Sequence, residues 1–233
     1  MEGTSASAVV RSRGRRLVRA ALLVVVFGFP VLLLAFAIRQ GFEPMLAIDD
    51  TVIATATGLT RNWGLASALI FLQAISHPFV VYTAATSVVA WTWVAKGFRG
   101  RAIWAFSTMM VGWVVGEIMK LIVQRVRPDL DSPMSHPGGY SFPSGHALNI
   151  TVATSVMLLL LWPLLGAIRR VLTVVLAALV VLAVGLDRIF LGVHFPSDVL
   201  AGYVLGCCIT FSSWIGFVGR TAVTSSSEPS GPR

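Results

Sequence analysis

Long apolar segments constrain the fold of this chain more than any other feature. A helix needs about 20 mostly apolar residues to cross the ~30 Å hydrocarbon core of a bilayer. Five segments meet or approach that length, and a sixth does so apart from two charged residues near its far end. The six segments are 20–38, 78–95, 102–123, 147–168, 171–186 and 199–218. Because lipid-exposed backbone must satisfy its own hydrogen bonds, the pattern predicts an all-α, polytopic membrane bundle with about six transmembrane helices.

The composition favours a membrane protein over a water-soluble one. The 233 residues are 56% hydrophobic and only 12% charged, whereas soluble domains carry roughly 25% charged residues. The formal net charge of +8 is typical of nucleic-acid binding when it stands alone. In so apolar a chain it instead indicates basic loops beside a bilayer, so we expect no nucleic-acid partner. Cys207 and Cys208 are adjacent in an apolar segment, a spacing that predicts neither a disulfide framework nor a metal site.

No break in composition divides the chain, so we expect one membrane domain, at residues 17–220. A basic cytoplasmic N-terminus at 1–16 is expected before it. A disordered cytoplasmic tail at 221–233, rich in Ser, Pro and Gly, is expected after it. The residues 35–37, Ala-Phe-Ala, resemble a signal-peptidase site. The length of the first apolar segment favours an uncleaved anchor over a signal peptide.

Basic residues predict the orientation. With the N-terminus in the cytoplasm and six crossings, most of the Lys and Arg residues fall on the cytoplasmic side, as the positive-inside rule requires. The segment 64–75 is apolar but too short to cross, and treating it as a span would turn the basic segment 96–101 outward. We expect 64–75 to be re-entrant or interfacial and 45–59 to form an interfacial helix. The predicted location is a bacterial plasma membrane with both termini cytoplasmic.

Unusual polar residues gather at the predicted extracytoplasmic ends of the spans. Lys120, Arg127 and Arg188 bring three cations to one face, because loops separated by two crossings lie on the same side. Such cations repel one another and lose hydration unless an anion lies between them. Ser144 and Gly145, at the start of a span, add a hydroxyl, backbone N–H groups and the positive end of a helix dipole. Each residue alone is explained by pairing with carboxylates or lipid headgroups, but the set predicts a phosphate cradle.

Two histidines lie beside this predicted cradle. His194 and Asp198 are four residues apart with Pro196 between them, which predicts a helix that begins near Phe195. A carboxylate in the first turn can accept a hydrogen bond from one ring nitrogen and leave the other free to attack. His146 is placed to protonate a leaving oxygen. The set is complete for phosphoryl transfer and needs no metal, because the cations neutralise the developing charge.

A site with two histidine metal ligands is a weaker interpretation, since the three nearby cations would repel the ion.

Three motifs resemble the signature of the type 2 phosphatidic acid phosphatase and vanadium haloperoxidase superfamily. They are Lys120-x6-Arg127-Pro128, Pro143-Ser144-Gly145-His146 and Arg188-x5-His194-x3-Asp198, in that order and with the spacings kept. The resemblance implies a six-helix membrane lipid phosphatase with its site near the extracytoplasmic surface and with no metal or other cofactor.

The same resemblance implies a role for each residue. His194 attacks phosphorus to form a phosphohistidine, Asp198 orients it, and His146 protonates the leaving group and then helps to activate water. The residues that hold the phosphoryl oxygens are Lys120, Arg127, Ser144, Gly145 and Arg188. One position departs from the family, because Asp187 stands where the third motif usually has serine. That carboxylate would repel a phosphate unless it turns away or pairs with a cation.

The sequence predicts a lipid phosphate as the substrate but does not identify it. Polyprenyl diphosphate is favoured because an outward-facing site suits it, and the alternatives are phosphatidate, phosphatidylglycerophosphate, a lipid A phosphate and a phosphorylated glycolipid carrier. A phosphotransferase with the same nucleophile, or a non-catalytic lipid or anion binder or transporter, are the competing functions. The oligomeric state stays open.

Overall fold

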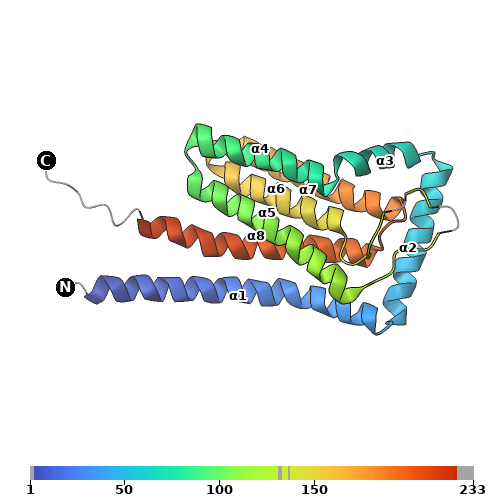
Figure 1. Ribbon diagram of the computed structural model, residues 1–233, viewed down its shortest axis with the longest axis horizontal. Helices are drawn as coiled ribbons and strands as arrows, with labels where there is room; N and C mark the ends of the chain where they lie inside the picture. Colours follow the sequence, from blue (N-terminus) through green and yellow to red (C-terminus); the bar gives the residue numbers. More distant parts are fainter. Residues whose placement is uncertain (1–2, 131–132, 136, 225–233) are drawn as a thin grey trace.

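A computed structural model describes residues 3–130, 133–135 and 137–224, and over those ranges the chain is helical apart from its turns and loops (Figure 1). The helices are α1 (Gly3–Arg39), α2 (Glu43–Asn62), α3 (Ala66–Ile75), α4 (Pro78–Lys96), α5 (Arg99–Val123), α6 (Gly145–Leu161), the 3-10 turn η1 (Trp162–Leu164), α7 (Ala167–Phe190) and α8 (Pro196–Thr224).

Six helices in the described ranges are long and apolar enough to cross a membrane: α1 from Leu17, α4, α5, α6 together with η1, α7, and α8 as far as Phe217. They run back and forth along one axis, so that the start of α1 and the end of α8 lie at one end of the bundle (Figure 1). Large apolar side chains such as Val171, Leu172 and Leu176 on α7 are exposed, as a lipid-facing surface requires. The predicted all-α membrane bundle is therefore confirmed.

One predicted boundary is wrong. The apolar segment at 147–168 joins two helices, because α6 ends at Leu161 and α7 begins at Ala167. Pro163 lies in the turn between them, where it interrupts the helix although its neighbours are as apolar as a span. At the other end of the chain α8 extends to Thr224, four residues into the segment expected to be a tail. The rest of that segment, 225–233, lies outside the described residues.

Helices α2 and α3 lie at the end of the bundle opposite the start of α1 (Figure 1). Helix α2 runs across the ends of the spans and packs against α7 and α8. Its inward face is formed by buried residues that recur about once per helical turn, namely Asp49, Ile53, the pair Ala56 and Thr57, and Thr60. Helix α3 has only ten residues and packs against α7. Neither helix is among the six candidate spans of the described residues, in agreement with the prediction that 45–59 and 64–75 do not cross the membrane.

Helix α6 contacts four other helices, α4, α5, α7 and α8. Its contact with α8 is close because Gly202 and Gly206 leave no side chain between them. A Cβ atom on Gly202 would lie 2.9 Å from the carbonyl oxygen of Ser144, and one on Gly206 would lie 2.8 Å from Cβ of Thr151. This spacing of small residues lets two membrane helices approach closely. It sets the start of α8 against the start of α6, which carry parts of the third and second motifs.

We expect Gly206→Val to lower the thermal unfolding temperature of the detergent-purified protein, because the added side chain clashes with Thr151 and overpacking costs about 1–3 kcal/mol. Gly216→Val is the matched control, since a Cβ atom there meets nothing within 4 Å. Equal unfolding temperatures for the two variants would show that α6 and α8 are not packed as described.

Candidate active site

The predicted site residues meet at the end of the bundle that carries α2 and α3. Lys120 lies near the end of α5, Arg127 in the following loop, Ser144, Gly145 and His146 at the start of α6, Arg188 near the end of α7, His194 in the turn after it and Asp198 in the first turn of α8. Backbone hydrogen bonds join them: the N–H of Ser144 donates to the carbonyl of Asp198 (3.0 Å), and that of His194 donates to Arg188 (3.3 Å).

His194 is held by Asp198 mainly through Ser141. The Nδ1 atom of His194 lies 3.7 Å from Oδ2 of Asp198, which is beyond a hydrogen bond, and 3.3 Å from the Ser141 hydroxyl. That hydroxyl donates its single proton to Asp198 at 2.6 Å, so its oxygen is left to accept from His194. This chain of contacts assigns the ring proton to Nδ1 and the lone pair to Nε2. Ser141 precedes the second motif, and no spacing argument identified it as a site residue.

Arg127 contacts the opposite edge of the His194 ring. Its Nη1 lies 3.1 Å from Nε2 of His194 and donates to the carbonyl of Val193 at 2.8 Å. Its other nitrogens donate to the carbonyls of Gly138 and Gly139, both at 3.1 Å. An arginine has only donors, so its approach agrees with a lone pair on Nε2. Three carbonyls thus hold a guanidinium beside the nitrogen that would attack.

The His194 ring is 3% exposed. Burial, opposed by Asp198 and aided by the nearby cations Arg127 and Arg188, lowers the pKa of His194 to about 4. The ring is therefore neutral at neutral pH, the state in which Nε2 can act as a nucleophile. Burial also lowers the pKa of the Arg127 guanidinium, which Asp198 partly offsets, but an arginine remains charged.

Asp187 pairs with a cation. A carboxylate paired in this way would not repel a phosphate bound in the site. Its carboxylate accepts from Nε of Arg188 at 2.9 Å and also from Nη2. Both side chains are buried. The remaining Nη1 of Arg188 donates to Oε1 of Gln73 at 3.0 Å, and Gln73 also exchanges hydrogen bonds with Ser135. Gln73 lies on α3, a segment without a recognisable motif, and sequence reasoning missed it.

His146 offers an unused nitrogen to the site. Its Nε2 is buried and makes no hydrogen bond within the described part of the chain. The His146 ring meets His77 edge-on, with 5.8 Å between centroids. Lys120 approaches the same helix start from α5, since a Cβ atom on Gly145 would lie 3.3 Å from its Nζ. Lys120 also pairs with Glu117 at 2.7 Å.

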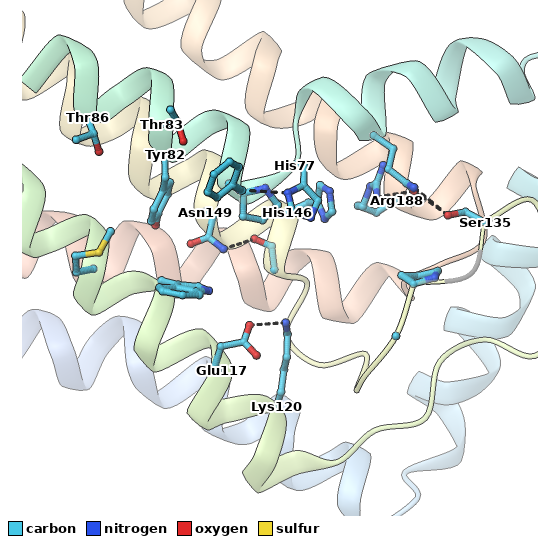
Figure 2. Close-up of a pocket in the computed structure, with 18 of the residues that line it drawn as sticks. His77, Tyr82, Thr83, Thr86, Glu117, Lys120, Ser135, His146, Asn149 and Arg188 are labelled. Atoms are coloured by element: carbon cyan, nitrogen blue, oxygen red, sulfur yellow. Dashed lines mark hydrogen bonds and ion pairs between the residues drawn. The ribbon is translucent and has the colours of Figure 1, made fainter.

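A cavity of about 990 Å³ opens beside these groups (Figure 2). Lys120, His146 and Arg188 form part of its polar lining, and it continues along apolar residues such as Phe79, Met110 and Trp113. Figure 2 shows His146 next to His77, with Lys120 and Glu117 reaching in from α5. An anionic headgroup at one end and an apolar chain along the other would fit such a lining. Within the described residues, no three His, Cys, Asp or Glu side chains are grouped so as to hold a metal ion.

A family model decides the relationship of this chain to known proteins. The model of the PAP2 superfamily matches residues 101–222, just over half of the chain and all three motifs. The chain belongs to the PAP2 superfamily. The resemblance inferred from the motifs is thereby confirmed.

Several PAP2 relatives carry names of lipid phosphatases. An undecaprenyl-diphosphatase of Sulfolobus acidocaldarius is 29% identical over 82% of this chain and 86% of its own length. A phosphatidylglycerophosphatase B of Bacillus subtilis is 36% identical over 42% of this chain. A decaprenylphosphoryl-5-phosphoribose phosphatase of Mycobacterium tuberculosis is 33% identical over 48% of this chain. The chain spans about half of the Bacillus relative (49%) and 59% of the mycobacterial one.

The fold is also that of a solved PAP2 protein. A crystal structure of a transmembrane PAP2-type phosphatidylglycerolphosphate phosphatase from Bacillus subtilis superposes with a TM-score of 0.73 at 21% sequence identity, covering 89% of this chain and 98% of that one. At that identity the likeness shows the six-helix fold and leaves the substrate to other arguments.

The buried His194 of this PAP2 protein should titrate far below an ordinary histidine. In detergent-solubilised protein with ¹³C-labelled histidine and no ligand, we expect an NMR midpoint near pH 4 for the resonance that disappears in His194→Gln, because burial disfavours the charged ring. The folded-state pKa lies below the unfolded value of about 6.5, so this group costs stability as pH falls from about 6.5 towards 4. A midpoint near 6.5 would contradict a buried, neutral His194.

Proposed function

We propose that the protein is an integral membrane lipid phosphatase that hydrolyses a phosphoester or diphosphate bond of a lipid through a phosphohistidine on His194. One observation carries the proposal. A buried imidazole has Nδ1 against the Ser141–Asp198 pair and Nε2 3.1 Å from a guanidinium nitrogen of Arg127. A nucleophile with its proton held on one side and an anion-binding group on the other is the arrangement that phosphoryl transfer needs.

In the first step the lone pair on Nε2 of His194 forms a bond to phosphorus while the bond from phosphorus to the leaving oxygen breaks. His146, whose Nε2 is unpartnered, donates the proton that the leaving oxygen takes up. The phosphorylated ring becomes positive, and the carboxylate of Asp198 offsets that charge through Ser141. The phosphoryl oxygens are held by Arg127 and by the helix start at Ser144 and Gly145. Lys120 on α5 and Arg188 on α7 are the other cations that hold them.

In the second step His146 takes a proton from water, the water oxygen bonds to phosphorus, and the bond to Nε2 breaks to release inorganic phosphate. Fixed cations and backbone N–H groups stabilise the charge that develops on the phosphoryl oxygens. We therefore propose a reaction that needs no metal.

The favoured substrate is a polyprenyl diphosphate. The cavity that begins at His146 and continues along Phe79 and Trp113 suits a lipid chain attached to a phosphate. A relative that aligns with 82% of this chain is named an undecaprenyl-diphosphatase, and the names of the other two relatives also describe phosphatases of lipid phosphates. We further propose that both termini are cytoplasmic and that the site faces outward, since the basic residues predict that orientation.

Detergent-purified protein should release phosphate from a lipid phosphate in the presence of EDTA, and His194→Ala should release none, because no other group can form the covalent bond. Asp198→Asn should lower kcat by at least about tenfold and change KM less, since it weakens an interaction made in the transition state. Unfolding temperatures measured in parallel show whether each variant is folded. Release by folded His194→Ala at near wild-type rate would refute the mechanism.

Among polyprenyl diphosphate, phosphatidate, phosphatidylglycerophosphate and a lipid A phosphate, we expect the highest kcat/KM for polyprenyl diphosphate. The measurement is phosphate release from each lipid in the same detergent, with and without an added alcohol acceptor. A higher kcat/KM for any other lipid would overturn the substrate assignment. Transfer of the phosphoryl group to the acceptor in place of water would identify a phosphotransferase.

A further inference from the structure

A second buried arginine, besides Arg188, contacts Asp198, the carboxylate next to the proposed nucleophile. Arg125 is 7% exposed and occupies one of the unspecified positions between Lys120 and Arg127 in the first motif. Its Nη1 donates to Oδ1 of Asp198 and to the hydroxyl of Ser197, both at 2.7 Å, and its Nη2 donates to Oδ2 of Asp49 at 2.7 Å. Its guanidinium also lies over the ring of Phe195, 4.0 Å from the centroid. One side chain therefore joins α2 to the first turn of α8.

Asp49 is the partner that α2 contributes. It lies on the inward face of α2, is 2% exposed, and accepts from the backbone N–H of Ser197 at 3.0 Å and from the Ser197 hydroxyl as well as from Arg125. The next residue, Asp50, is exposed on the same helix. Burial of a carboxylate is costly unless it is paired and hydrogen-bonded, so the position of Asp49 depends on these contacts.

The charges of this cluster differ from those of a simple ion pair. Asp198 is fully buried, and its Oδ1 binds Arg125 while its Oδ2 accepts from Ser141 and from the N–H of Phe195. If Arg125 faced Asp198 alone, the pair would be neutral. With Asp49 as a second carboxylate, the three groups carry one net negative charge. The nearest of these groups to His194 is Asp198, whose Oδ2 lies 3.7 Å from Nδ1.

The cation on a phosphorylated imidazole ring needs such a negative charge nearby. Arg127 and Arg188 both act against a positive His194, and the Asp187 carboxylate is already engaged by Arg188. Asp198 is the carboxylate whose contacts reach the ring through Ser141. The positive charge of Arg125 partly neutralises the negative charge of Asp198. Because Asp49 also pairs with Arg125, less of the negative charge of Asp198 is neutralised, and Asp198 can stabilise the positive ring.

We propose that Asp49 and Arg125 are positioning residues for the reaction, through which α2 fixes Asp198 and keeps a net negative charge on the Nδ1 side of His194. This inference rests on the proposed function. Neither residue touches the phosphate. Their effect reaches it through Asp198, Ser141 and His194, and it is required when the ring becomes positive and less so when substrate merely binds.

The test is Asp49→Asn, which keeps the shape of the side chain and removes its charge, with Asp50→Asn as the matched control on the same helix. We expect Asp49→Asn to lower kcat by at least about tenfold and to leave KM within about twofold, whereas Asp50→Asn behaves as the wild type. Arg125→Lys keeps the charge but lacks the planar fork and should show the same split between kcat and KM if Asp49→Asn cannot be purified folded.

Inhibition separates this electrostatic role from a purely structural one. Vanadate mimics the transferring phosphoryl group and bonds to the attacking nitrogen, so it makes the ring positive, whereas inorganic phosphate binds without that bond. Asp49→Asn should weaken vanadate inhibition about tenfold and change phosphate inhibition by less than about twofold. Equal weakening of both inhibitors, or a loss of kcat matched by a fall in unfolding temperature, would overturn the proposal.

Wild-type kcat in Asp49→Asn would also overturn it. That result, together with an inactive His194→Ala, would leave the proposed function standing. Activity in His194→Ala would instead remove the proposed function itself.

Discussion

The site depends on the hydrogen bonds that surround one buried carboxylate, that of Asp198. A fully buried charge is costly unless several donors surround it, and the structure supplies three, from Arg125, Ser141 and the backbone of Phe195. Arg125 lies near the start and Ser141 near the end of the loop between α5 and α6. Their hydrogen bonds to the carboxylate of Asp198 therefore hold both ends of that loop against α8. The loop also carries Arg127, which is thereby placed beside His194.

Close packing of α6 against α8 provides the second constraint. Gly202 faces the carbonyl of Ser144, and the N–H of Ser144 donates to the carbonyl of Asp198. The start of one helix is therefore fixed to the first turn of the other by both packing and hydrogen bonding. Rigid elements that hold reacting groups in place lower the cost of orienting them. The helix start at Gly145 and His194, the proposed nucleophile, belong to one such unit.

Much of this arrangement could be predicted from the sequence, because two features that produce it can be read directly from the order of residues along the chain. The length of the apolar segments indicated the spans, and the alternation of crossings indicated that the three motifs share one end. The turn at Pro163 was missed because its neighbours are as apolar as a span. Asp49, Gln73 and Ser141 were missed because their partners lie far away in the chain, 148 residues in the case of Asp49 and Ser197. A polar residue on an interfacial helix gives no sign of such a partner.

The central claim is that a phosphoryl group is transferred to His194, and trapping the phosphorylated protein tests it most directly. Protein mixed briefly with lipid substrate ³²P-labelled in its terminal phosphate would be quenched in alkali, which preserves phosphohistidine. The account predicts label in a single peptide containing His194, and no label in folded His194→Asn. Label on another residue, or unchanged labelling of His194→Asn, would contradict it.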